Sequence, residues 1–251
     1  MSKIALITGA TSGIGMATAF KMAEQGYNLI LTGRREDRLQ SIKTKLLELN
    51  IEVLTLCFDI RLRTEVEQAV SGIPKEWKNI DVLVNNAGLA SGKDPLQSGD
   101  IDRWESMIDT NVKGLLYMSR MIIPNMEKKK SGHIINIGST AGKEVYPGGN
   151  VYCATKFAVD ALSKGMRIDL VESGVKVTQI RPGLVETEFS KVRFDWDEEA
   201  ADKVYENLEP LFANDVAEMV IFAVNQPPHV CINDLEVTCT AQATSTIVHR
   251  S

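Results

Sequence analysis

Tyr152 and Lys156 stand four residues apart in the segment NVYCATKFAV, which has the apolar spacing of a helix. Residues four apart lie on one helical face, so the lysine ammonium is expected beside the tyrosine phenol. A free tyrosine loses its proton near pH ~10, and a neighbouring cation lowers this pKa because it favours the phenolate. The pair predicts a general acid and base for near-neutral pH. The same spacing also occurs in ordinary surface pairs, so its surroundings must decide between the two.

Ser139 supplies part of those surroundings. It follows the apolar run 133–137 and precedes Tyr152 by thirteen residues. Ligands of open α/β sheets bind at the carboxyl ends of the strands, so Ser139 is expected at the edge where such a ligand lies.

A glycine-rich turn follows the first apolar run and leads directly into a helical pattern. Its residues are Gly9, Ala10, Thr11, Ser12, Gly13, Ile14 and Gly15. Glycines let a backbone approach a pyrophosphate, and the N–H groups of the following helix then point at it. The spacing differs from the commoner GxGxxG form, and tight packing alone is the alternative. A strand before and a helix after favour dinucleotide binding.

Arg34 and Arg35 end the second apolar run. Sites selective for NAD usually place an acid here for the ribose 2′-hydroxyl, whereas arginine accommodates the 2′-phosphate of NADP. The alternative is a solvated helix start, although cations are unfavourable at a helix N-terminus without an anion nearby. NADP is therefore predicted over NAD, with Glu36 and Asp37 the only nearby acids.

Asp59 follows the third apolar run, with Ile60 beside it. The carboxylate can accept a hydrogen bond from an adenine amino group at the sheet edge, so both residues are assigned to the predicted cofactor site. A helix N-cap is the other interpretation of Asp59.

A sheet is needed to position these residues. Short apolar, β-branched runs predict strands at residues 3–8, 28–32, 52–57, 80–84, 133–137, 175–180 and 234–238. Helical spacing predicts helices at residues 14–25, 38–49, 104–126, 151–171 and 216–224. Nearly all-apolar strands alternating with helices predict a single-domain, doubly wound Rossmann-type α/β fold over residues 1–251, with about seven parallel strands and helices on both faces.

Composition narrows the classes of partner. The 251 residues carry a net charge of −5, which gives no general basic surface for nucleic acid. The N-terminal segment MSKIALITGA has too short an apolar run for a signal sequence or a membrane span, so a cytoplasmic location without membrane partners is expected.

Cysteine and histidine spacing bears on metal binding. Cys57, Cys153, Cys231 and Cys239 show no metal-ligand spacing, and the three histidines do not cluster. Buried free thiols and no metal site are predicted.

Several of these motifs occur together in one known family. TGxxxGIG at residues 8–15, Asn85-Asn86-Ala87-Gly88, Asn111, Ser139, Tyr152-x-x-x-Lys156 and Pro182-Gly183 have the order and spacing of the short-chain dehydrogenase/reductase family. The chain resembles that family over nearly its whole length. Three longer segments, including SGHIINIGSTAGKEVYPGGNVYCATKFAV, resemble its branch of NADP-dependent 3-hydroxy acid (serine) dehydrogenases.

The resemblance implies roles for individual residues. Tyr152 would exchange the hydroxyl proton, Lys156 would lower its pKa and hold the nicotinamide ribose, and Ser139 would hydrogen-bond the substrate oxygen. Asn111 would complete a water-linked proton relay to Lys156. Cofactor contacts would come from Asn86, Ala87, Gly88, Pro182, Gly183, Val185 and Thr187. Hydrogen bonding at the sheet end is an equal interpretation of Asn85 and Asn86.

Residues 184–212 break the strand–helix rhythm with aromatic and charged side chains. A mobile substrate lid is predicted there, with a plain surface insertion as the alternative. A 3-hydroxy acid carries a carboxylate, which suits a bidentate arginine. Arg193 in the lid is the first candidate for that contact and Arg181 the second, while an exposed Arg193 without a specific role stays open.

Three functions are compatible with these residues. The first is NADP-dependent oxidation of a small 3-hydroxy acid of the serine, allo-threonine or 3-hydroxypropionate type. The second is reduction of 3-oxoacyl thioesters or other ketones, which a large basic patch beside the site would favour. The third is non-catalytic NADP sensing, because a fold does not imply an activity. The family resemblance also implies a homotetramer formed through residues 104–126, 151–171 and the last strand.

Overall fold

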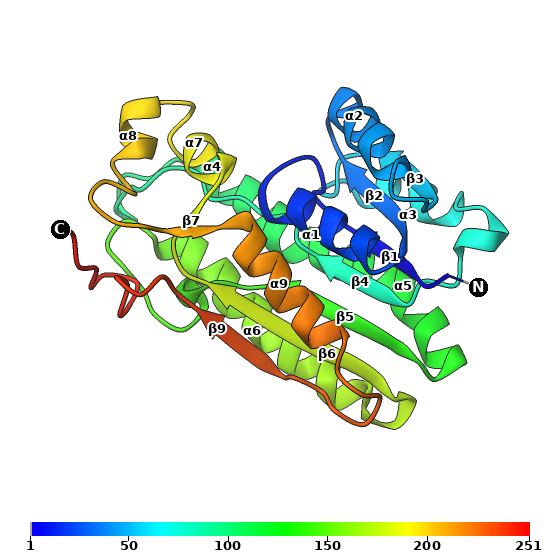
Figure 1. The fold of residues 1–251 in the computed structure, drawn as a ribbon. Coiled ribbons are helices and arrows are strands. Elements are labelled where there is room, and N and C mark those ends of the chain that lie inside the picture. The colour runs from blue at the N-terminus through cyan, green and yellow to red at the C-terminus, as the bar shows by residue number, and fades with distance from the viewer. Residues whose placement is uncertain (1) are drawn as a thin grey trace.

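A seven-stranded sheet organises residues 2–251, the part of the chain that the computed structural model describes (Figure 1). Its strands are β1 (Ile4–Ile7), β2 (Asn28–Gly33), β3 (Val53–Cys57), β4 (Val82–Asn85), β5 (Gly132–Ile137), β6 (Val175–Pro182) and β9 (Asp234–Val237). They lie in the order β3-β2-β1-β4-β5-β6-β9, and every neighbouring pair is parallel. The predicted sheet is confirmed, with each strand end within two residues of its expected position.

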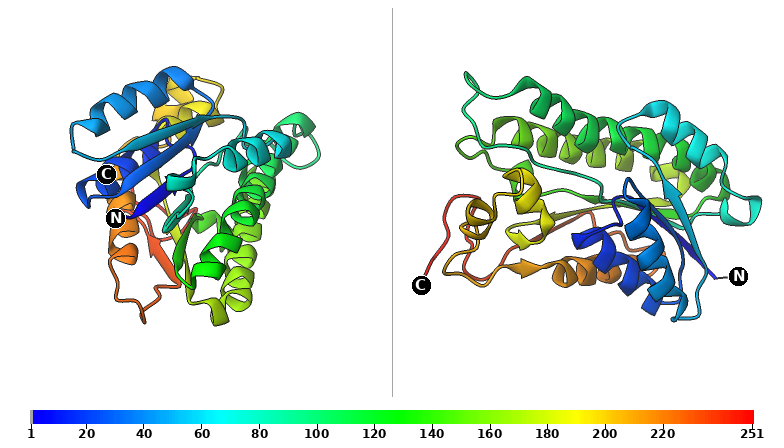
Figure 2. Two further views of the ribbon diagram at one scale, coloured as in Figure 1. Left: turned by 90° about the vertical axis from the view of Figure 1, so that its right-hand side faces the viewer. Right: turned by 90° about the horizontal axis from the view of Figure 1, so that it is seen from above.

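Helices cover both faces of this sheet, as predicted (Figure 2). One face carries α1 (Gly13–Glu24), α2 (Glu36–Leu47) and α9 (Ala213–Val224). The other carries α3 (Arg63–Ser71), α5 (Leu115–Lys129) and α6 (Asn150–Asp169). Apolar side chains on both faces of the central strands are thereby removed from water, which is the main force that holds the layers together.

The predicted helix at residues 104–126 is divided in the structure. It consists of α4 (Ile101–Ile108), a π-helical segment (Asp109–Gly114) and α5. Such wide turns are rare inside helices and frequent at functional sites. This one buries Thr110, Asn111 and Gly114, and a Cβ atom on Gly114 would lie 3.0 Å from Ile60.

Helix α3 was not predicted from the sequence. Its nine residues, RTEVEQAVS, are mostly polar, and only Val66 and Val70 are buried. Two apolar positions four residues apart are too few for helical periodicity to stand out from a loop.

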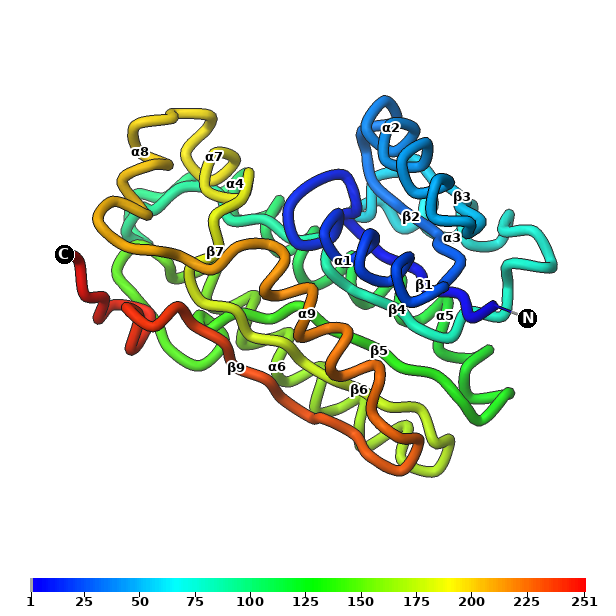
Figure 3. The backbone as a smooth tube through the Cα atoms, in the orientation of Figure 1, coloured from blue at the N-terminus to red at the C-terminus, as the bar shows by residue number. Residues whose placement is uncertain are grey.

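The segment 184–212 has secondary structure of its own. Strands β7 (Val185–Glu186) and β8 (Leu211–Phe212) form a small parallel sheet, with α7 (Glu188–Arg193) and α8 (Glu198–Asp202) between them. The C-terminal residues run beside this segment (Figure 3). Arg250 donates hydrogen bonds to the carbonyls of Val204 and Glu206, and the Ser251 amide donates to the Asn207 carbonyl.

The prediction of buried thiols is correct for only two of the four cysteines. Cys153 and Cys239 are buried, whereas Cys57 and Cys231 are exposed. Cys57 ends β3, an edge strand that has a neighbour on one side only, and Cys231 precedes the opposite edge strand, β9. Within residues 2–251, no group of three or more His, Cys, Asp or Glu side chains could hold a metal ion. Nor is any helix of that range long and apolar enough to cross a membrane.

Candidate active site

A cavity of about 530 Å³ lies at the carboxyl ends of the sheet strands. It is lined by residues that follow β1, β2, β3, β4, β5 and β6 and by part of the segment 184–212. Most of the predicted site residues line it: Gly9, Thr11, Ser12, Gly13, Ile14, Arg34, Arg35, Asp59, Ile60, Asn86, Ala87, Gly88, Ser139, Tyr152, Lys156, Pro182, Gly183, Val185, Thr187 and Arg193. Ala10, Gly15 and Asn111 are buried just behind this lining.

The glycine-rich turn is shaped for close backbone approach. Gly9 and Gly13 have φ values of 64° and 51°, in the left-handed region that favours glycine. A Cβ atom on Gly15 would lie 2.4 Å from the Asn86 amide nitrogen, so a side chain cannot fit there without displacing Asn86. Ser12 precedes α1 and makes no side-chain capping hydrogen bond within residues 2–251, so the amide groups at the start of α1 are not capped by its hydroxyl.

Asn86 secures this turn from the neighbouring strand. Its side-chain amide donates to the carbonyls of Thr8 at 2.9 Å and Gly9 at 3.2 Å. Asn85 points the other way and donates to Ser119 and Asn136 in the buried interior. Both asparagines therefore make hydrogen bonds at the sheet end, and Asn86 in addition lines the cavity.

Arg35 folds back over the glycine-rich turn. It donates to the hydroxyl of Thr11 at 2.8 and 3.2 Å and to that of Ser12 at 3.0 Å, and its Nη1 contacts a Glu188 carboxylate oxygen at 3.0 Å. Arg34 stays more open, with 57% of its side chain exposed and Nη1 3.9 Å from Asp59. Two guanidinium groups thus lie at the end of β2, next to the turn.

The N-cap interpretation of Asp59 is wrong. Helix α3 starts after Leu62, while Asp59 accepts hydrogen bonds from the backbone amide and the guanidinium of Arg61. Burial raises the pKa of Asp59, but the hydrogen bonds from Arg61 outweigh burial and hold it below its usual value. The carboxylate faces the cavity in its charged form.

The predicted catalytic residues converge at one end of the cavity. Lys156 donates from Nζ to the Ile137 carbonyl at 2.9 Å, and Nζ lies 5.9 Å from the centre of the Tyr152 ring. Ser139 follows β5, its side chain accepts from the Ala141 amide at 3.1 Å, and it lines the same cavity as Tyr152. Spacing along α6 and the end of β5 thus bring these three side chains together, as the sequence predicts.

Burial dominates the electrostatics of these groups. Burial lowers the pKa of Lys156 to about 8 and raises that of Tyr152, although the Arg193 charge acts on Tyr152 in the opposite direction. The prediction that the Tyr152 pKa lies below that of free tyrosine is therefore wrong for this structure. The cation expected to stabilise a phenolate is itself destabilised by the same burial.

Asn111 lies in the π-helical segment behind the cavity. Its side chain accepts from the Leu89 amide at 2.8 Å and donates to the Leu89 carbonyl at 2.8 Å and to the Thr155 hydroxyl at 3.0 Å. Thr155 is the residue before Lys156. Asn111 thus connects the loop after β4 with the start of α6 and is 2% exposed.

Arg193 is held above the Tyr152 ring. Its Nε donates to the Gly92 carbonyl at 3.2 Å and its Nη1 to the Tyr146 hydroxyl at 3.0 Å, and its guanidinium carbon lies 5.8 Å from the centre of the Tyr152 ring. The remaining nitrogen, Nη2, is buried and has no hydrogen-bond partner among residues 2–251. Arg193 is not a freely exposed surface arginine.

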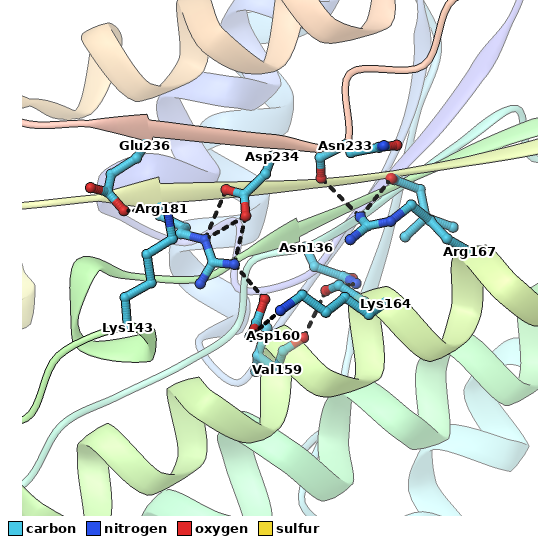
Figure 4. A network of polar contacts seen from close by, with 12 residues as sticks. Asn136, Lys143, Val159, Asp160, Lys164, Arg167, Arg181, Asn233, Asp234 and Glu236 are labelled. Carbon is cyan, nitrogen blue, oxygen red and sulfur yellow. Dashed lines mark hydrogen bonds and ion pairs between the residues drawn. The ribbon is translucent and has the colours of Figure 1, made fainter.

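Arg181 does not lie in the site, so its assignment as a carboxylate-binding residue is wrong. Its side chain is 1% exposed and hydrogen-bonds the carboxylates of Asp160 on α6 and Asp234 on β9 (Figure 4). Side chains alternate along a strand, and the one at position 181 points under the sheet edge towards α6. The two aspartates already neutralise its charge.

Comparison with known proteins completes the description of this site. Residues 3–198 match the short chain dehydrogenase family. The chain is a member of this family. The resemblance that the sequence motifs carry is thus confirmed, and with it the prediction of an oxidoreductase that acts on CH–OH groups.

Two relatives and one solved structure of this short-chain dehydrogenase are informative. The NADP-dependent 3-hydroxy acid dehydrogenase YdfG of Salmonella typhi is 48% identical over 99% of this chain and 100% of its own. Sulfoacetaldehyde reductase 2 of Chromohalobacter salexigens is 43% identical over 98% of this chain and 97% of its own. The closed form of a serine dehydrogenase complexed with NADP+ superposes with a TM-score of 0.92 at 47% identity, covering 99% of this chain and 100% of that one.

Several residues of the short-chain dehydrogenase site were not predicted. Tyr146 holds Arg193, Phe189 packs against Tyr152 with ring centres 5.7 Å apart, and Tyr205 hydrogen-bonds Ser190 and the Val185 carbonyl. Glu188 pairs with Arg35 and Arg38. For Phe189 and Tyr205, the only sequence signal was the concentration of aromatic residues in 184–212. The partners of each are fixed only by the fold.

Proposed function

We propose that this short-chain dehydrogenase is an NADP-dependent enzyme that interconverts a small 3-hydroxy acid and the corresponding 3-oxo acid. The relatives named above support both the cofactor and the substrate class. When bound, NADP supplies the hydride acceptor, and NADPH the donor.

The cavity residues fit such a dinucleotide. The turn from Gly9 to Gly15 leaves room for a pyrophosphate to approach the backbone and the amides at the start of α1. At Gly15 the close neighbours leave no space for a side chain. Arg34 and Arg35 line the cavity at the end of β2 and would supply the cations that a 2′-phosphate needs, in place of the acid that NAD-selective sites usually carry near this strand end. In this proposal Asp59 and Ile60 border the adenine, and Val185 and Thr187 border the nicotinamide.

Tyr152 takes the proton of the substrate hydroxyl as the hydride leaves the carbon that bears it. Ser139 donates a hydrogen bond to the substrate oxygen and to its developing charge. Lys156 holds the nicotinamide ribose and, when protonated, favours the phenolate form of Tyr152. Asn111 fixes the position of Lys156 through its hydrogen bonds to Leu89 and to Thr155, the residue before Lys156. It also completes the proton relay through a water molecule.

The observation that carries the substrate class is the Arg193 guanidinium. It lines the cavity beside Tyr152, and the atoms that hold it, the Gly92 carbonyl and the Tyr146 hydroxyl, are neutral. A half-buried cation without a carboxylate partner among residues 2–251 keeps its attraction for an anion. The carboxylate of a 3-hydroxy acid in the cavity would balance this charge through a charge-assisted contact with the guanidinium.

The surface beside the cavity opposes a carrier-bound thioester. Acidic carrier proteins need a basic docking surface, yet residues 195–209 carry seven acids and one lysine, and the acidic side chains are exposed. These acids are Asp195, Asp197, Glu198, Glu199, Asp202, Glu206 and Glu209. A free small acid is therefore the better substrate.

The decisive experiment follows the near-ultraviolet absorbance of NADPH with serine, allo-threonine, 3-hydroxypropionate, 2-hydroxyethanesulfonate and a neutral secondary alcohol of similar size. Reduction of NADP by the carboxylates, lost by ~10²–10⁴-fold in Tyr152→Phe, is the expected result. Turnover of the sulfonate alone would replace the hydroxy acid with the substrate class of the second relative. Tight NADP binding without turnover of any member would overturn the proposal in favour of other ketones or of nucleotide sensing.

The same proposal extends to assembly. Exposed apolar side chains lie on the outer faces of α5 and α6, including Leu116, Phe157 and Ile168, the last 73% exposed. Such faces are typical of subunit interfaces. We propose a homotetramer through these helices and β9, which sedimentation velocity tests directly. A mobile lid at 184–212 and a cytoplasmic location are further predictions of the sequence.

A further inference from the structure

Helix α7 joins two charged contacts at its two ends. Its first residue, Glu188, pairs with arginines beside the glycine-rich turn, and its last, Arg193, lies above Tyr152. Six helical residues place these Cα atoms about 8 Å apart along the axis. One short helix thus connects the predicted 2′-phosphate side of the cavity with the predicted substrate side.

The Glu188 contacts anchor the start of α7 to the start of α2. One carboxylate oxygen is 3.0 Å from Arg35 Nη1 and the other 2.6 Å from Arg38 Nη1, and 30% of the Glu188 side chain is exposed. Burial raises the Glu188 pKa, but the hydrogen bonds from Arg38 and Arg35 outweigh it and hold the pKa below its usual value. Arg35 is itself fixed by the Thr11 and Ser12 hydroxyls, so Glu188 binds to a rigid neighbour.

A helix this short needs such an anchor. Isolated helices of fewer than about 12 residues are marginal in water, so α7 depends on what fixes its ends. Within residues 2–251, the N-terminal end is fixed by the Thr187 cap and by Glu188. The C-terminal end is fixed by Arg193 itself, through Gly92 and Tyr146.

We propose that Glu188 is a positioning residue for substrate recognition: by binding Arg35 and Arg38 it sets the place of Arg193 through α7. This inference rests on the proposed function, in which Arg193 binds the substrate carboxylate. Glu188 lines the cavity on the predicted 2′-phosphate side, five residues before Arg193 on α7, and so acts on the substrate side at a distance. Loss of Glu188 should therefore weaken the binding of hydroxy acids and leave the binding of neutral alcohols unchanged.

The test compares Glu188→Gln, Glu188→Asp, Arg38→Gln and the double variant Glu188→Gln/Arg38→Gln with the parent enzyme at saturating NADP. Arg38 is a matched control because it binds Glu188 but does not line the cavity. We expect Glu188→Gln to raise the KM for 3-hydroxypropionate by about 3- to 10-fold, as befits a lost charge-assisted hydrogen bond acting indirectly. The KM for a neutral secondary alcohol should stay within about 2-fold, since no carboxylate is involved.

The other variants fix the mechanism. Arg38→Gln should shift the hydroxy-acid KM in the same direction but by less, and the double variant should be no worse than Glu188→Gln alone, because both remove one contact. Glu188→Asp, which keeps the charge, should recover part of the loss. NADP affinity, measured by the fluorescence of bound NADPH, should not fall, because a negative charge near the phosphate site is removed.

Two results would overturn the inference. One is an equal rise of KM for acid and alcohol, or no rise at all. The other is a weakened NADP affinity that accounts for the whole change, which would leave Glu188 as a support for the cofactor arginines only. Arg193→Gln, measured in parallel, separates the inference from the proposed function: a hydroxy-acid defect there with none in Glu188→Gln refutes only the inference. An Arg193→Gln variant without such a defect refutes both.

Discussion

Arg181 and Arg193 are both arginines near the carboxyl edge of one sheet, yet the regions around them differ in the charge that they supply. The β6–α6–β9 region surrounds Arg181 with the carboxylates of Asp160 and Asp234. The segment 184–212 and its neighbours offer Arg193 only a carbonyl and a phenol. Each arginine has one nitrogen without a hydrogen-bond partner among residues 2–251, so the hydrogen-bond count does not separate them.

What separates them is charge balance and access. Arg181 is neutralised within the chain and packs against Gly142, whereas Arg193 lines a cavity with its charge unopposed. An arginine held by neutral acceptors still attracts an anionic ligand. An arginine paired with carboxylates does not, because its charge is already neutralised.

Removal of Arg181 should therefore mainly reduce stability, whereas removal of Arg193 should mainly reduce activity. The largest expected effect is the loss of stability. Arg181→Met leaves Asp234 without this cation and Asp160 with Lys164 alone, and it should lower the free energy of unfolding by about 3–5 kcal/mol. Arg193→Met should lower it by about 1 kcal/mol or less, as for a partly exposed charge without an ion-pair partner. Urea denaturation of both variants measures the difference, and equal losses would contradict the comparison.

Activity should show the reverse order. Arg193→Gln should lower kcat/KM for the hydroxy acid by about 10- to 100-fold, the value of a charged hydrogen bond. Arg193→Lys should lose less, because it keeps the charge but not the planar fork. Steady-state kinetics with the hydroxy acid and a neutral alcohol measure the effect. A similar loss on the alcohol would mean that Arg193 supports the site rather than the carboxylate.

His133 extends the comparison of the two arginines to a third basic side chain, which is buried and has no carboxylate partner among residues 2–251. Its Nε2 lies 2.7 Å from the Thr178 hydroxyl, and burial, followed by the Lys176 charge, lowers its pKa to about 3. An unfolded histidine titrates near pH ~6.5, so between these two values the unfolded state binds more protons. The free energy of unfolding should then fall as the pH falls, by about 1.4 kcal/mol per unit.

The measurement compares urea midpoints at pH 6.5 and 5 in the parent protein and in His133→Gln. The variant should lose about 2 kcal/mol less over this interval, because glutamine binds no proton. Identical pH dependence in the two proteins would show that carboxylates account for all of it.

The smallest effect should come from Tyr146→Phe. The change removes the hydroxyl that accepts from Arg193 at 3.0 Å but keeps the ring beside the guanidinium. Because the Gly92 carbonyl still holds the guanidinium, the indirect loss in substrate binding should be about 1 kcal/mol, which predicts a 2- to 5-fold higher KM for the hydroxy acid. Tyr205→Phe is the control, since that hydroxyl contacts Ser190 and the Val185 carbonyl instead. Equal effects of the two changes would argue against a specific support of Arg193.

The sequence predicts those features of the fold and site that depend on residues close together in the chain. Strands such as Leu29–Leu31 show their burial on both faces directly as apolar runs, so the sheet and the residues at its carboxyl ends follow from the sequence. Tyr152 and Lys156 lie on one helix turn, and their closeness follows from spacing alone.

The rest depends on contacts between distant segments. Asp160 and Asp234 are 21 and 53 residues from Arg181, and Glu188 is 153 residues from Arg35. No local pattern marks such pairs, so Arg181 was misassigned and Glu188 was missed. The π-helical turn at Asn111 is equally invisible, because helical spacing continues through residues 104–126 on both sides of it.

Asp234 follows Arg181 by 53 residues, and this separation has a consequence for synthesis on the ribosome. Strand β6, with Arg181, leaves the ribosome more than fifty residues before its partner β9. Until β9 arrives, this edge of the sheet is open and Arg181 lacks one of its two carboxylates. An open strand edge favours incomplete or misassembled intermediates. This edge of the sheet is therefore expected to complete its folding only after Asp234 has left the ribosome, and a stalled chain that ends before Asp234 is expected to be a substrate for chaperones and proteases.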